Sequence, residues 1–491
     1  MSDTQSTRES ILAAVPTGIL IGGQWREGSS GGRVSVDDPA TGDELATVAD
    51  ATAADATAAL DAAVAAQRSW AATPPRVRGE ILRRSYELMI ERQEDLALLM
   101  TLEMGKPLSE SRSEVAYAAD FFRWFSEEAV RQNGSWTTAP DGLSRLLTMK
   151  QPVGPSLLVT PWNFPLAMGT RKIGPALAAG CTVIVKPAKQ TPLSMHALAG
   201  ILIEAGLPDG VLGIVTTSKA SAVVSTLLAD PRLRKLSFTG STEVGRVLAE
   251  QSAAGMLRLS MELGGNAPFI VFDDADLEHA ADEAMKAKLR NNGEACTAAN
   301  RFYVQAGVLD EFTELLRVRF EKLVVGAGYD ASSTVGPLID RAAVEKITGL
   351  VDDAVAAGAR VVSQVAPPEG SGFYFPPTLL ADVAPDARIV REEIFGPVAP
   401  IVSFTTEEQA LEFANSSEYG LASYLFTRDL DRAIRVAEGL EAGMVGLNRG
   451  VLSNVAAPFG GIKSSGFGRE GGNEGIDEYQ ETKYVALDVK V

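Results

Sequence analysis

The residues most able to do chemistry in this chain are a cysteine and a glutamate, each set in a short segment that contains glycine. Cys296 is one of only two cysteines among 491 residues and lies in NNGEACTAANR, residues 291–301. Glu262 lies earlier, in MELGGNAP, where a glycine pair precedes an apolar, strand-like run. A thiol nucleophile and a carboxylate base are the chemistry that this pair indicates.

The other cysteine and both histidines have settings typical of structural residues. Cys181 precedes the Val/Ile-rich run TVIVK, which suits a buried free cysteine, whereas the polar flanks of Cys296 favour a functional role. His196 and His279 lie in helix-like segments, so a Cys–His or Ser–His pair, and with it a cofactor-independent thiol hydrolase, is not indicated. The scarcity of cysteine and histidine also argues against zinc, and we expect no metal.

Charge and composition exclude several classes of partner. Acidic residues outnumber basic residues by 63 to 45, which gives a net charge of −18 without any Lys/Arg-rich run. We therefore expect neither nucleic acid nor an anionic membrane surface as a partner. The N-terminal segment lacks the pattern of a signal peptide, and no apolar run approaches the ~20 residues of a membrane span. Two cysteines cannot form a disulfide framework, which favours the cytoplasm.

The order of apolar patterns predicts an α/β protein with two or more domains, as the chain length also requires. Residues 1–50 alternate short extended runs with turns, and long helices are expected from residue 51 to residue 132. From Pro155 strands and helices alternate, which is typical of βαβ units and a parallel sheet. Further strands are expected at NAPFIVF, KLVVG, RVVS and PIVSF. The tail EYQETKYVALDVKV predicts an exposed strand that could pair with another subunit.

Two loops at predicted strand ends suggest a dinucleotide. Gly240, Ser241 and Gly245 lie in FTGSTEVGR, which follows a strand and opens a helix, a setting that favours phosphate binding. A turn that merely caps the helix is the common alternative. Lys186 ends another strand and could hold a ribose or phosphate, although a surface turn is an equal alternative. Ligands bind at the carboxyl ends of parallel strands, so one crevice is expected.

Seven segments together resemble the aldehyde dehydrogenase superfamily over nearly the whole chain. They occur in the order PWNFP, KPAKQTP, FTGSTEVG, MELGGNAP, GEACTAANR, EEIFGPV and PFGGIKSSGFGRE. The resemblance implies an α/β fold with a Rossmann-like coenzyme domain (1–136 and 158–262) and an α/β catalytic domain (263–462). It also implies a small β oligomerisation arm and C-terminal tail (137–157 and 463–491), and a homodimer or homotetramer.

The resemblance also implies a role for individual residues. Cys296 is similar to the thiolate that attacks the aldehyde carbon, and Asn163 with the Cys296 N–H resembles the oxyanion hole. Glu262 resembles the base that activates water to hydrolyse the thioester, which favours hydrolysis over release to coenzyme A. Donors fixed in advance suit a transient oxyanion. The positions that resemble the cofactor site are Trp162, Lys186, Lys189, Gly240, Ser241, Gly245, Leu263, Glu393 and Phe395.

Four positions bear on specificity. Lys189 stands where many NAD-preferring relatives carry a glutamate that binds the adenosine ribose, which favours NADP, with NAD possible; the alternative is a lysine turned to solvent. Arg171, Arg290 and Ser453 resemble the residues that hold the distal carboxylate in succinate-semialdehyde dehydrogenases. The expected substrate is therefore a small anionic aldehyde, since arginine suits planar carboxylates.

Alternative functions remain open at this point. A dehydrogenase of glutarate semialdehyde or of another short aldehyde acid would use the same chemistry. Both arginines could instead pair with nearby acids. A catalytically silent dinucleotide-binding protein is a further alternative, against which the retained Cys296 and Glu262 argue. Thr297 and Ala298 follow the cysteine where some relatives carry a second cysteine, so a redox disulfide is not expected.

Overall fold

The computed structural model describes residues 2–488. The strands between residues 156 and 262 belong to one eight-stranded sheet. Its five central strands, β9-β8-β7-β10-β11, are parallel, while β1, β2 and β21 extend it by antiparallel pairing. In sheet order the strands are β2 (Gln24–Arg26), β1 (Ile19–Ile21), β9 (Leu212–Ile214), β8 (Val183–Lys186), β7 (Ser156–Val159), β10 (Lys235–Thr239), β11 (Arg258–Glu262) and β21 (Gly466–Phe467).

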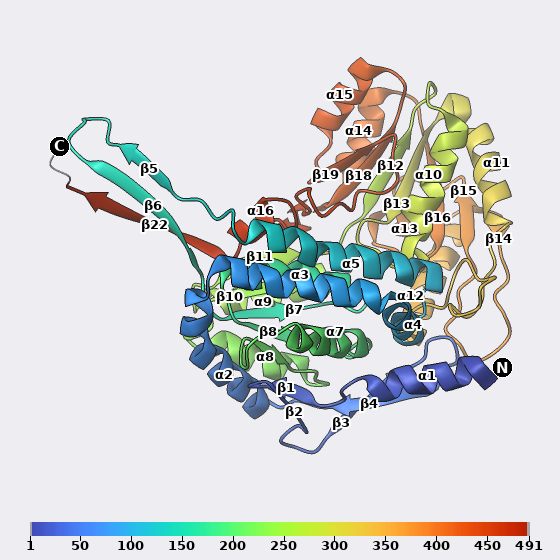
Figure 1. The fold of residues 1–491 in the computed structure, drawn as a ribbon. Helices are drawn as coiled ribbons and strands as arrows, with labels where there is room; N and C mark the ends of the chain where they lie inside the picture. The colour runs from blue at the N-terminus through green and yellow to red at the C-terminus, as the bar shows by residue number, and fades with distance from the viewer. Residues whose placement is uncertain (1, 489–491) are drawn as a thin grey trace.

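Helices cover both faces of this sheet (Figure 1). Successive residues of a strand point to opposite faces, so Leu158 packs into one core and its neighbour Leu157 into the other. The first core is formed with α3 (Pro75–Glu91), α4 (Gln93–Met104), α5 (Leu108–Glu128), α6 (Ala167–Ala179) and α7 (Leu193–Glu204). The second is formed with α2 (Ala53–Ala72), α8 (Ala220–Ala229) and α9 (Thr242–Ala253). The alternation predicted from the sequence is therefore confirmed in this region.

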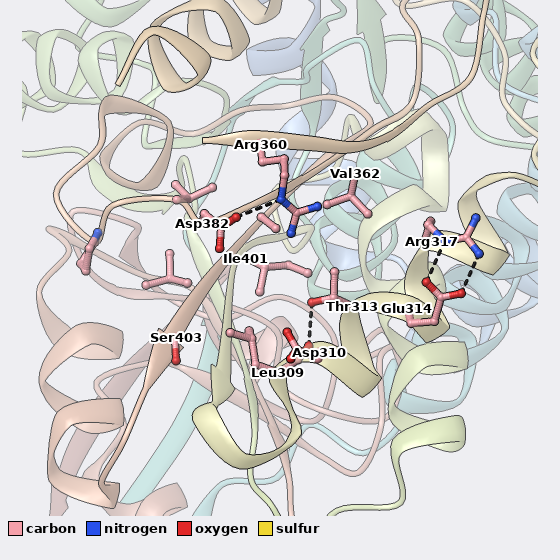
Figure 2. Close-up of a pocket in the computed structure, with 14 residues that line it drawn as sticks. Leu309, Asp310, Thr313, Glu314, Arg317, Arg360, Val362, Asp382, Ile401 and Ser403 are labelled. Carbon is pink, nitrogen blue, oxygen red and sulfur yellow. Dashed lines mark hydrogen bonds and ion pairs between the residues drawn. The ribbon is translucent and has the colours of Figure 1, made fainter. Parts of the chain in front are cut away.

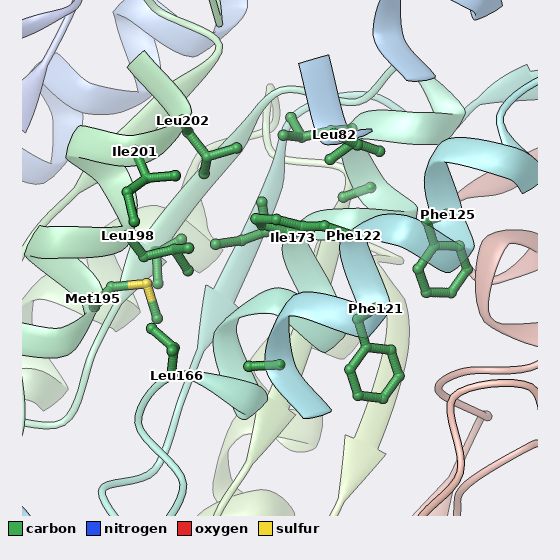
Figure 3. Close-up of a cluster of buried hydrophobic side chains, with 14 of the residues drawn as sticks. Leu82, Phe121, Phe122, Phe125, Leu166, Ile173, Met195, Leu198, Ile201 and Leu202 are labelled. Atoms are coloured by element: carbon green, nitrogen blue, oxygen red, sulfur yellow. The ribbon is translucent and has the colours of Figure 1, made fainter. Parts of the chain in front are cut away.

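A large apolar cluster fixes α5 and α6 against α3 and α7 (Figure 3). Phe121, Phe122 and Phe125 project from one face of α5 at helical spacing, and all three are fully buried. Burying side chains of this size stabilises a core by roughly 1.5–3 kcal/mol each. Because α5 and α6 are locked here, the polar residues on their other faces have fixed positions.

The second half of the chain forms a seven-stranded sheet, parallel except for its edge strand β14. In sheet order the strands are β14 (Arg360–Gln364), β15 (Thr378–Ala381), β16 (Val398–Phe404), β13 (Ala299–Gln305), β12 (Ala267–Val271), β18 (Ala422–Phe426) and β19 (Met444–Leu447). The strand expected at KLVVG is wrong, because Val325 makes only an isolated bridge to Val335 after α11 ends. Val324 in this run is exposed, and Leu323 and Val325 are only half-buried.

The remaining helices surround this second sheet or join it to the first. They are α10 (Leu277–Leu289), η1 (Arg290–Gly293), η2 (Ala306–Val308), α11 (Leu309–Phe320), α12 (Arg341–Ala356), α13 (Arg388–Arg391), α14 (Glu407–Asn415), α15 (Leu430–Gly439) and α16 (Glu474–Asp477). Two small ladders pair β3 (Arg33–Asp37) with β4 (Glu44–Ala49) and β17 (Tyr419–Gly420) with β20 (Ile462–Lys463).

A three-stranded antiparallel sheet projects away from the rest of the molecule (Figure 1). Its order is β22 (Gln480–Leu487), β6 (Arg145–Pro152) and β5 (Ser135–Thr138). The tail strand predicted from alternation is confirmed as β22, and its pairing partner in this structure is β6 of the same chain. The domain boundaries drawn from the sequence stay a prediction, and β21 within the predicted arm joins the eight-stranded sheet instead.

The first residues depart from the extended pattern expected of residues 1–50. Residues Ser2–Ala14 form helix α1, and Pro16 follows where a helix could not continue. The weak apolar pattern of this helix gave no sign of it in the sequence. Among residues 2–488, no helix is long and apolar enough to cross a membrane.

Candidate active site

The polar residues singled out from the sequence meet at the carboxyl ends of four adjacent strands. Lys186 ends β8, Asn163 follows β7, Ser241 follows β10 and Glu262 ends β11, and these strands are neighbours in the sheet. Parallel strands all end at one edge, so this arrangement follows from the topology. The loop that carries Cys296 enters the same edge from the second sheet, just before β13.

The cysteine loop packs directly on the segment that follows Glu262. A Cβ atom added to Gly265 would lie 2.2 Å from the carbonyl oxygen of Cys296, so only glycine permits this approach. Asn291 and Asn292 precede the cysteine with left-handed φ values of 58°, a conformation that asparagine tolerates better than most residues. The Asn292 side chain bonds Pro337 O and Gly336 N, which anchors the turn. The close approach brings the two predicted chemical groups together.

Asn163 is tied to the cysteine loop by hydrogen bonds. Its Nδ2 donates to Glu294 O at 3.0 Å, and its own carbonyl accepts from Asn291 Nδ2 at 2.9 Å and Lys106 Nζ at 2.8 Å. A side-chain amide carries two N–H donors, and the bond to Glu294 uses one of them. The second N–H is the group that an oxyanion beside Cys296 would need.

Burial favours the neutral form of the Cys296 thiol. Burial, together with Glu393 and Glu262, raises the pKa of the thiol to about 12. Arg171 and Arg290 act in the opposite direction and lower it. Four ionisable side chains from different parts of the chain therefore act on the thiol of the half-buried Cys296. Cys181 differs, since it is fully buried beside Tyr479 and has no charged partner within bonding distance. The sequence-based contrast between the two cysteines is confirmed for their burial.

Glu262 is buried, and neither of its carboxyl oxygens has a hydrogen-bond partner among the described residues. Its pKa lies well above the ordinary value because it is buried and because Glu470 is near, although Arg171 and Lys172 oppose this. Buried carboxyl groups are normally satisfied, so such a group at a strand end is a candidate for a functional role. It is poised to exchange a proton with a water or a substrate.

The two arginines on the other side of Cys296 have different surroundings. Arg290 Nη1 donates to Ser453 Oγ at 2.9 Å, and its guanidinium lies 5.1 Å from the Phe164 ring centre, without an acidic partner. Arg171 forms a buried ion pair with Glu470, while its Nη2 has no partner. The expectation that both arginines could simply pair with acids therefore holds for Arg171 and is wrong for Arg290.

The residues predicted to bind a cofactor include Lys186, which ends β8. Lys186 is buried without an acidic partner, and burial lowers its pKa to about 8. It lines a cavity of about 420 Å³ between α8 and α9, together with Val159, Phe238 and Glu243. A buried ammonium beside an apolar slot at strand ends suits a nucleotide that carries a ribose and phosphates.

Several predicted cofactor residues are held by contacts with one another. The Trp162 ring meets the Phe395 ring edge to face at 5.4 Å, and Phe395 has a left-handed φ of 58°. Glu393 accepts from Gly265 N at 3.0 Å, and its burial raises its pKa to about 7. Through Gly265, Glu393 lies next to the loop that carries Cys296.

The glycines and Ser241 give the cofactor side its close backbone packing. A Cβ on Gly245 would lie 2.4 Å from Leu263, which explains a glycine in the first turn of α9. Ser241 caps α9 by accepting from Val244 N at 3.4 Å, and Gly240 begins this turn. Lys189 is exposed and has no bonded partner among the described residues. Its side chain is thus free to meet a ligand.

Comparison with known proteins agrees with this arrangement. The model of the aldehyde dehydrogenase family matches residues 25–485. The succinate-semialdehyde dehydrogenase of Paenarthrobacter nicotinovorans is 59% identical over 443 residues, which cover 90% of this chain and 98% of that protein. The chain belongs to the aldehyde dehydrogenase family.

Other relatives share the same length and fold. The succinate-semialdehyde dehydrogenase (NADP(+)) of Escherichia coli K12 is 50% identical and matches 95% of this chain and 97% of its own. The glutarate-semialdehyde dehydrogenase of Pseudomonas putida KT2440 is also 50% identical, with 96% and 97% covered. A crystal structure of an E. coli NADP dependent enzyme superposes with a TM-score of 0.96 at 49% identity, covering 98% and 99%. The fold predicted from the sequence is confirmed.

This aldehyde dehydrogenase uses buried ions that sequence reasoning missed. Lys106 is fully buried, pairs with Glu114 and donates to Asn163 O, so it fixes the loop that carries Asn163. Glu114 also accepts from the N–H groups of Leu166 and Ala167 at 3.0 Å, where α6 begins. Neither residue stands near a recognisable motif, and only the packing of α5 on α6 brings them to the site.

The histidines lie outside the site of this aldehyde dehydrogenase, as expected. His196 is buried in α7 and bonds Pro16 O and Thr216 Oγ1, whereas His279 is exposed on α10. Within residues 2–488 no group of three or more His, Cys, Asp or Glu side chains could hold a metal ion.

A separate cavity of about 500 Å³ lies between α11 and strands β14, β15 and β16 (Figure 2). Four of its five charged residues pair among themselves, Arg360 with Asp382 and Arg317 with Glu314, and the fifth is Asp310. None of the predicted site residues lines it. The chemistry therefore belongs to the strand-end site.

Proposed function

We propose that this aldehyde dehydrogenase oxidises succinate semialdehyde to succinate with NADP or NAD. The observation that carries the proposal is Arg290, bonded to Ser453 and lacking an acidic partner, close enough to Cys296 to affect its pKa. In a chain with a net charge of −18, an unpaired guanidinium beside a nucleophile favours an anionic substrate. The relatives named for succinate semialdehyde support the same choice.

In the proposed mechanism, the Cys296 thiol loses its proton to solvent and Sγ attacks the aldehyde carbon, so that a C–S bond forms and the C=O π bond breaks to leave an oxyanion. The second Nδ2–H of Asn163 and the N–H of Cys296 stabilise the oxyanion of this thiohemiacetal, and losing one such donor typically costs ~10²–10³ in rate. A bound nicotinamide cofactor would supply the acceptor for the hydride of the substrate carbon. Glu262 takes a proton from water as the water attacks the resulting thioester, so the C–S bond breaks and the acid leaves.

The cofactor would be held by Lys186, Ser241, Glu393 and Phe395, with Trp162, Gly240, Gly245 and Leu263 forming the walls. Lys186 brings a cation to the cavity between α8 and α9, and the half-buried Glu393 would offer an oxygen acceptor to a sugar hydroxyl. Lys189 is exposed, carries a positive charge, and favours a 2′-phosphate over a bare ribose. NADP is therefore proposed as the preferred cofactor.

Glutarate semialdehyde is the second candidate substrate. A relative named glutarate-semialdehyde dehydrogenase shares 50% identity with this chain, as much as the E. coli succinate-semialdehyde enzyme does. The two substrates differ by one methylene, and pockets discriminate such differences by only about 1–3 kcal/mol. Both are thus expected to react, at different rates.

We also propose a homodimer or homotetramer located in the cytoplasm. The projecting sheet exposes Trp136, Leu143 and Tyr484, and its outer strands β5 and β22 leave ladder edges unpaired within the chain. Open edges with apolar side chains favour association with a second copy. The two free cysteines agree with a reducing compartment. Light scattering on the purified protein measures the mass of the assembly directly.

The substrate proposal is tested by kinetics on four aldehydes. Succinate semialdehyde, glutarate semialdehyde, butanal and pentanal are compared at saturating NADP and again at saturating NAD. We expect kcat/KM for succinate semialdehyde to exceed that for butanal by at least about 10-fold, since a charged hydrogen bond contributes roughly 1.5–3 kcal/mol. Equal values for the charged and uncharged aldehydes would contradict the proposal.

A further inference from the structure

Tyr117 of α5 carries a hydroxyl group that its surroundings leave without a partner. Its oxygen is inaccessible to solvent and makes no hydrogen bond among the described residues, although part of the ring is exposed. The ring contacts Phe121 edge to face at 4.9 Å, and this contact would be as good for a phenylalanine. Buried hydroxyl groups are normally hydrogen-bonded, so the phenol oxygen requires an explanation.

The Tyr117 ring lies beside both arginines of the site. The Arg290 guanidinium is 5.9 Å from the Tyr117 ring centre and 5.1 Å from that of Phe164. Burial acts to lower the pKa of Arg171, whereas Glu470 and then Tyr117 raise it above the ordinary value. Tyr117 is therefore near both guanidinium groups, from a third segment of the chain.

Arg171, Arg290 and Tyr117 carry N–H or O–H donors that have no acceptor among the described residues, and the unpartnered carboxyl oxygens of Glu262 also lie near Arg171. Arg171 Nη2 is buried and has no acceptor, because Glu470 takes only its Nε. Arg290 uses Nη1 on Ser453 and has further N–H groups free of any acid. Tyr117 adds an O–H. A set of donors without an acceptor suits an anion with at least two oxygens.

Aromatic side chains surround these donors. Phe459 lies 4.1 Å from the Arg171 guanidinium, and Phe164 lies beside Arg290; both phenylalanines are buried. Such a shell holds the planar cations and limits access of water to them. Hydrogen bonds formed in this setting are stronger than in water, and an unfilled donor there is correspondingly unfavourable.

We propose that the Tyr117 hydroxyl binds the distal carboxylate of the substrate, donating a hydrogen bond alongside Arg171 Nη2 and Arg290. The inference rests on the proposed function, since it concerns the acid end of a semialdehyde. It makes Tyr117 a specificity-determining residue, which selects substrates by charge and leaves the reacting carbon untouched.

The test is Tyr117→Phe, which removes one oxygen and keeps the ring contacts with Phe121 and Arg290. Loss of a hydrogen bond to a charged group should reduce kcat/KM for succinate semialdehyde by about 10-fold or more, chiefly through KM. The value for butanal should stay within about twofold, because butanal has no carboxylate to lose. Tyr86→Phe is the matched control, since Tyr86 of α3 packs beside Arg123 in a surface hollow that none of the site residues lines.

A binding measurement separates a substrate contact from a structural role. The product succinate is titrated into the enzyme, and its binding is measured as protection of Cys296 against alkylation by iodoacetamide. Tyr117→Phe should raise the succinate concentration needed for half-maximal protection by about 10-fold. Unchanged thermal unfolding temperature would show that the fold is intact. Equal losses for butanal and succinate semialdehyde, or unchanged succinate protection, would overturn the inference.

The outcome also distinguishes this inference from the proposed function. If the wild-type enzyme prefers succinate semialdehyde to butanal and Tyr117→Phe leaves that preference intact, only the role of Tyr117 is wrong. If the wild-type enzyme shows no preference for the charged aldehyde, the proposed function itself fails, and the carboxylate contact fails with it.

Discussion

The two sides of Cys296 are built in different ways. The cofactor side is formed by turns at adjacent strand ends, and its shape depends on close backbone packing such as that of Gly245 on Leu263. The substrate side is formed by long side chains that come from α5, α6 and the loop before Cys296. Backbone geometry thus defines one half of the site, and side-chain charge defines the other.

This difference shows where specificity can change without loss of the reaction. A turn at a strand end is constrained by the ladder behind it, so its residues tolerate few substitutions. The substrate side holds its charges by separate contacts, the Arg171–Glu470 ion pair and the Arg290–Ser453 hydrogen bond. Substitution of the Arg290–Ser453 contact should therefore change which aldehyde binds, whereas loss of the buried Arg171–Glu470 pair should also weaken the fold around the site.

The largest expected effect lies where the two sides meet. Cys296→Ala should abolish aldehyde oxidation, a loss on the order of 10⁴-fold or more, because the covalent nucleophile is gone. Cofactor binding, measured by fluorescence quenching, should persist because the crevice lies at the ends of other strands. Substantial turnover in this variant would contradict the covalent mechanism and make the comparison of the two sides irrelevant to catalysis.

The pKa of the Cys296 thiol depends both on its burial and on the ionisable side chains on the two sides of it. Its pKa is raised to about 12 by burial, so the thiolate fraction is small at neutral pH and grows with pH. Alkylation by iodoacetamide without cofactor should accelerate by about tenfold per pH unit, or about 100-fold from pH 7 to pH 9. Cys296→Ala is the control for labelling of Cys181. A plateau below pH 9 would show that the arginines outweigh burial.

The two arginines sharpen the description of the substrate side. Arg290→Met should lower kcat/KM for succinate semialdehyde by about 10 to 150-fold with little change for butanal, because Arg290 lacks an acidic partner. Arg171→Met should impair both substrates and lower the thermal unfolding temperature, since Glu470 loses one of two buried cationic partners. Identical behaviour of the two variants would contradict the contrast drawn between them.

The smallest expected effect concerns the outer end of the cofactor side. Lys189→Glu should shift the ratio of kcat/KM for NADP to that for NAD by about fivefold or more toward NAD, as expected for one exposed ion pair. The shift should shrink at high salt, because Lys189 is exposed. Lys322→Glu, an exposed lysine after α11, controls for the change in net charge. An unchanged ratio would remove Lys189 from cofactor selection.

Much of the chemistry could be predicted because it lies in short, local signals. A lone cysteine with polar flanks and a glutamate at a strand end predicted Cys296 and Glu262 as the reactive pair, and the seven segments predicted the family, which is confirmed. The alternation of strands and helices from Pro155 predicted the parallel sheet, since period and turn residues are local properties. A tail with alternating apolar residues likewise predicted β22, though not its partner β6.

Only the tertiary structure decided which charges are free. Arg171 and Arg290 look alike in the sequence, yet Glu470 lies 299 residues after Arg171 and pairs with it, while Arg290 meets Ser453. Lys106 and the Tyr117 hydroxyl gave no signal, because their importance comes from helix packing across α5 and α6. A side chain's charge is fixed by its type, but its partners, its desolvation and hence its reactivity depend on which distant segments fold against it.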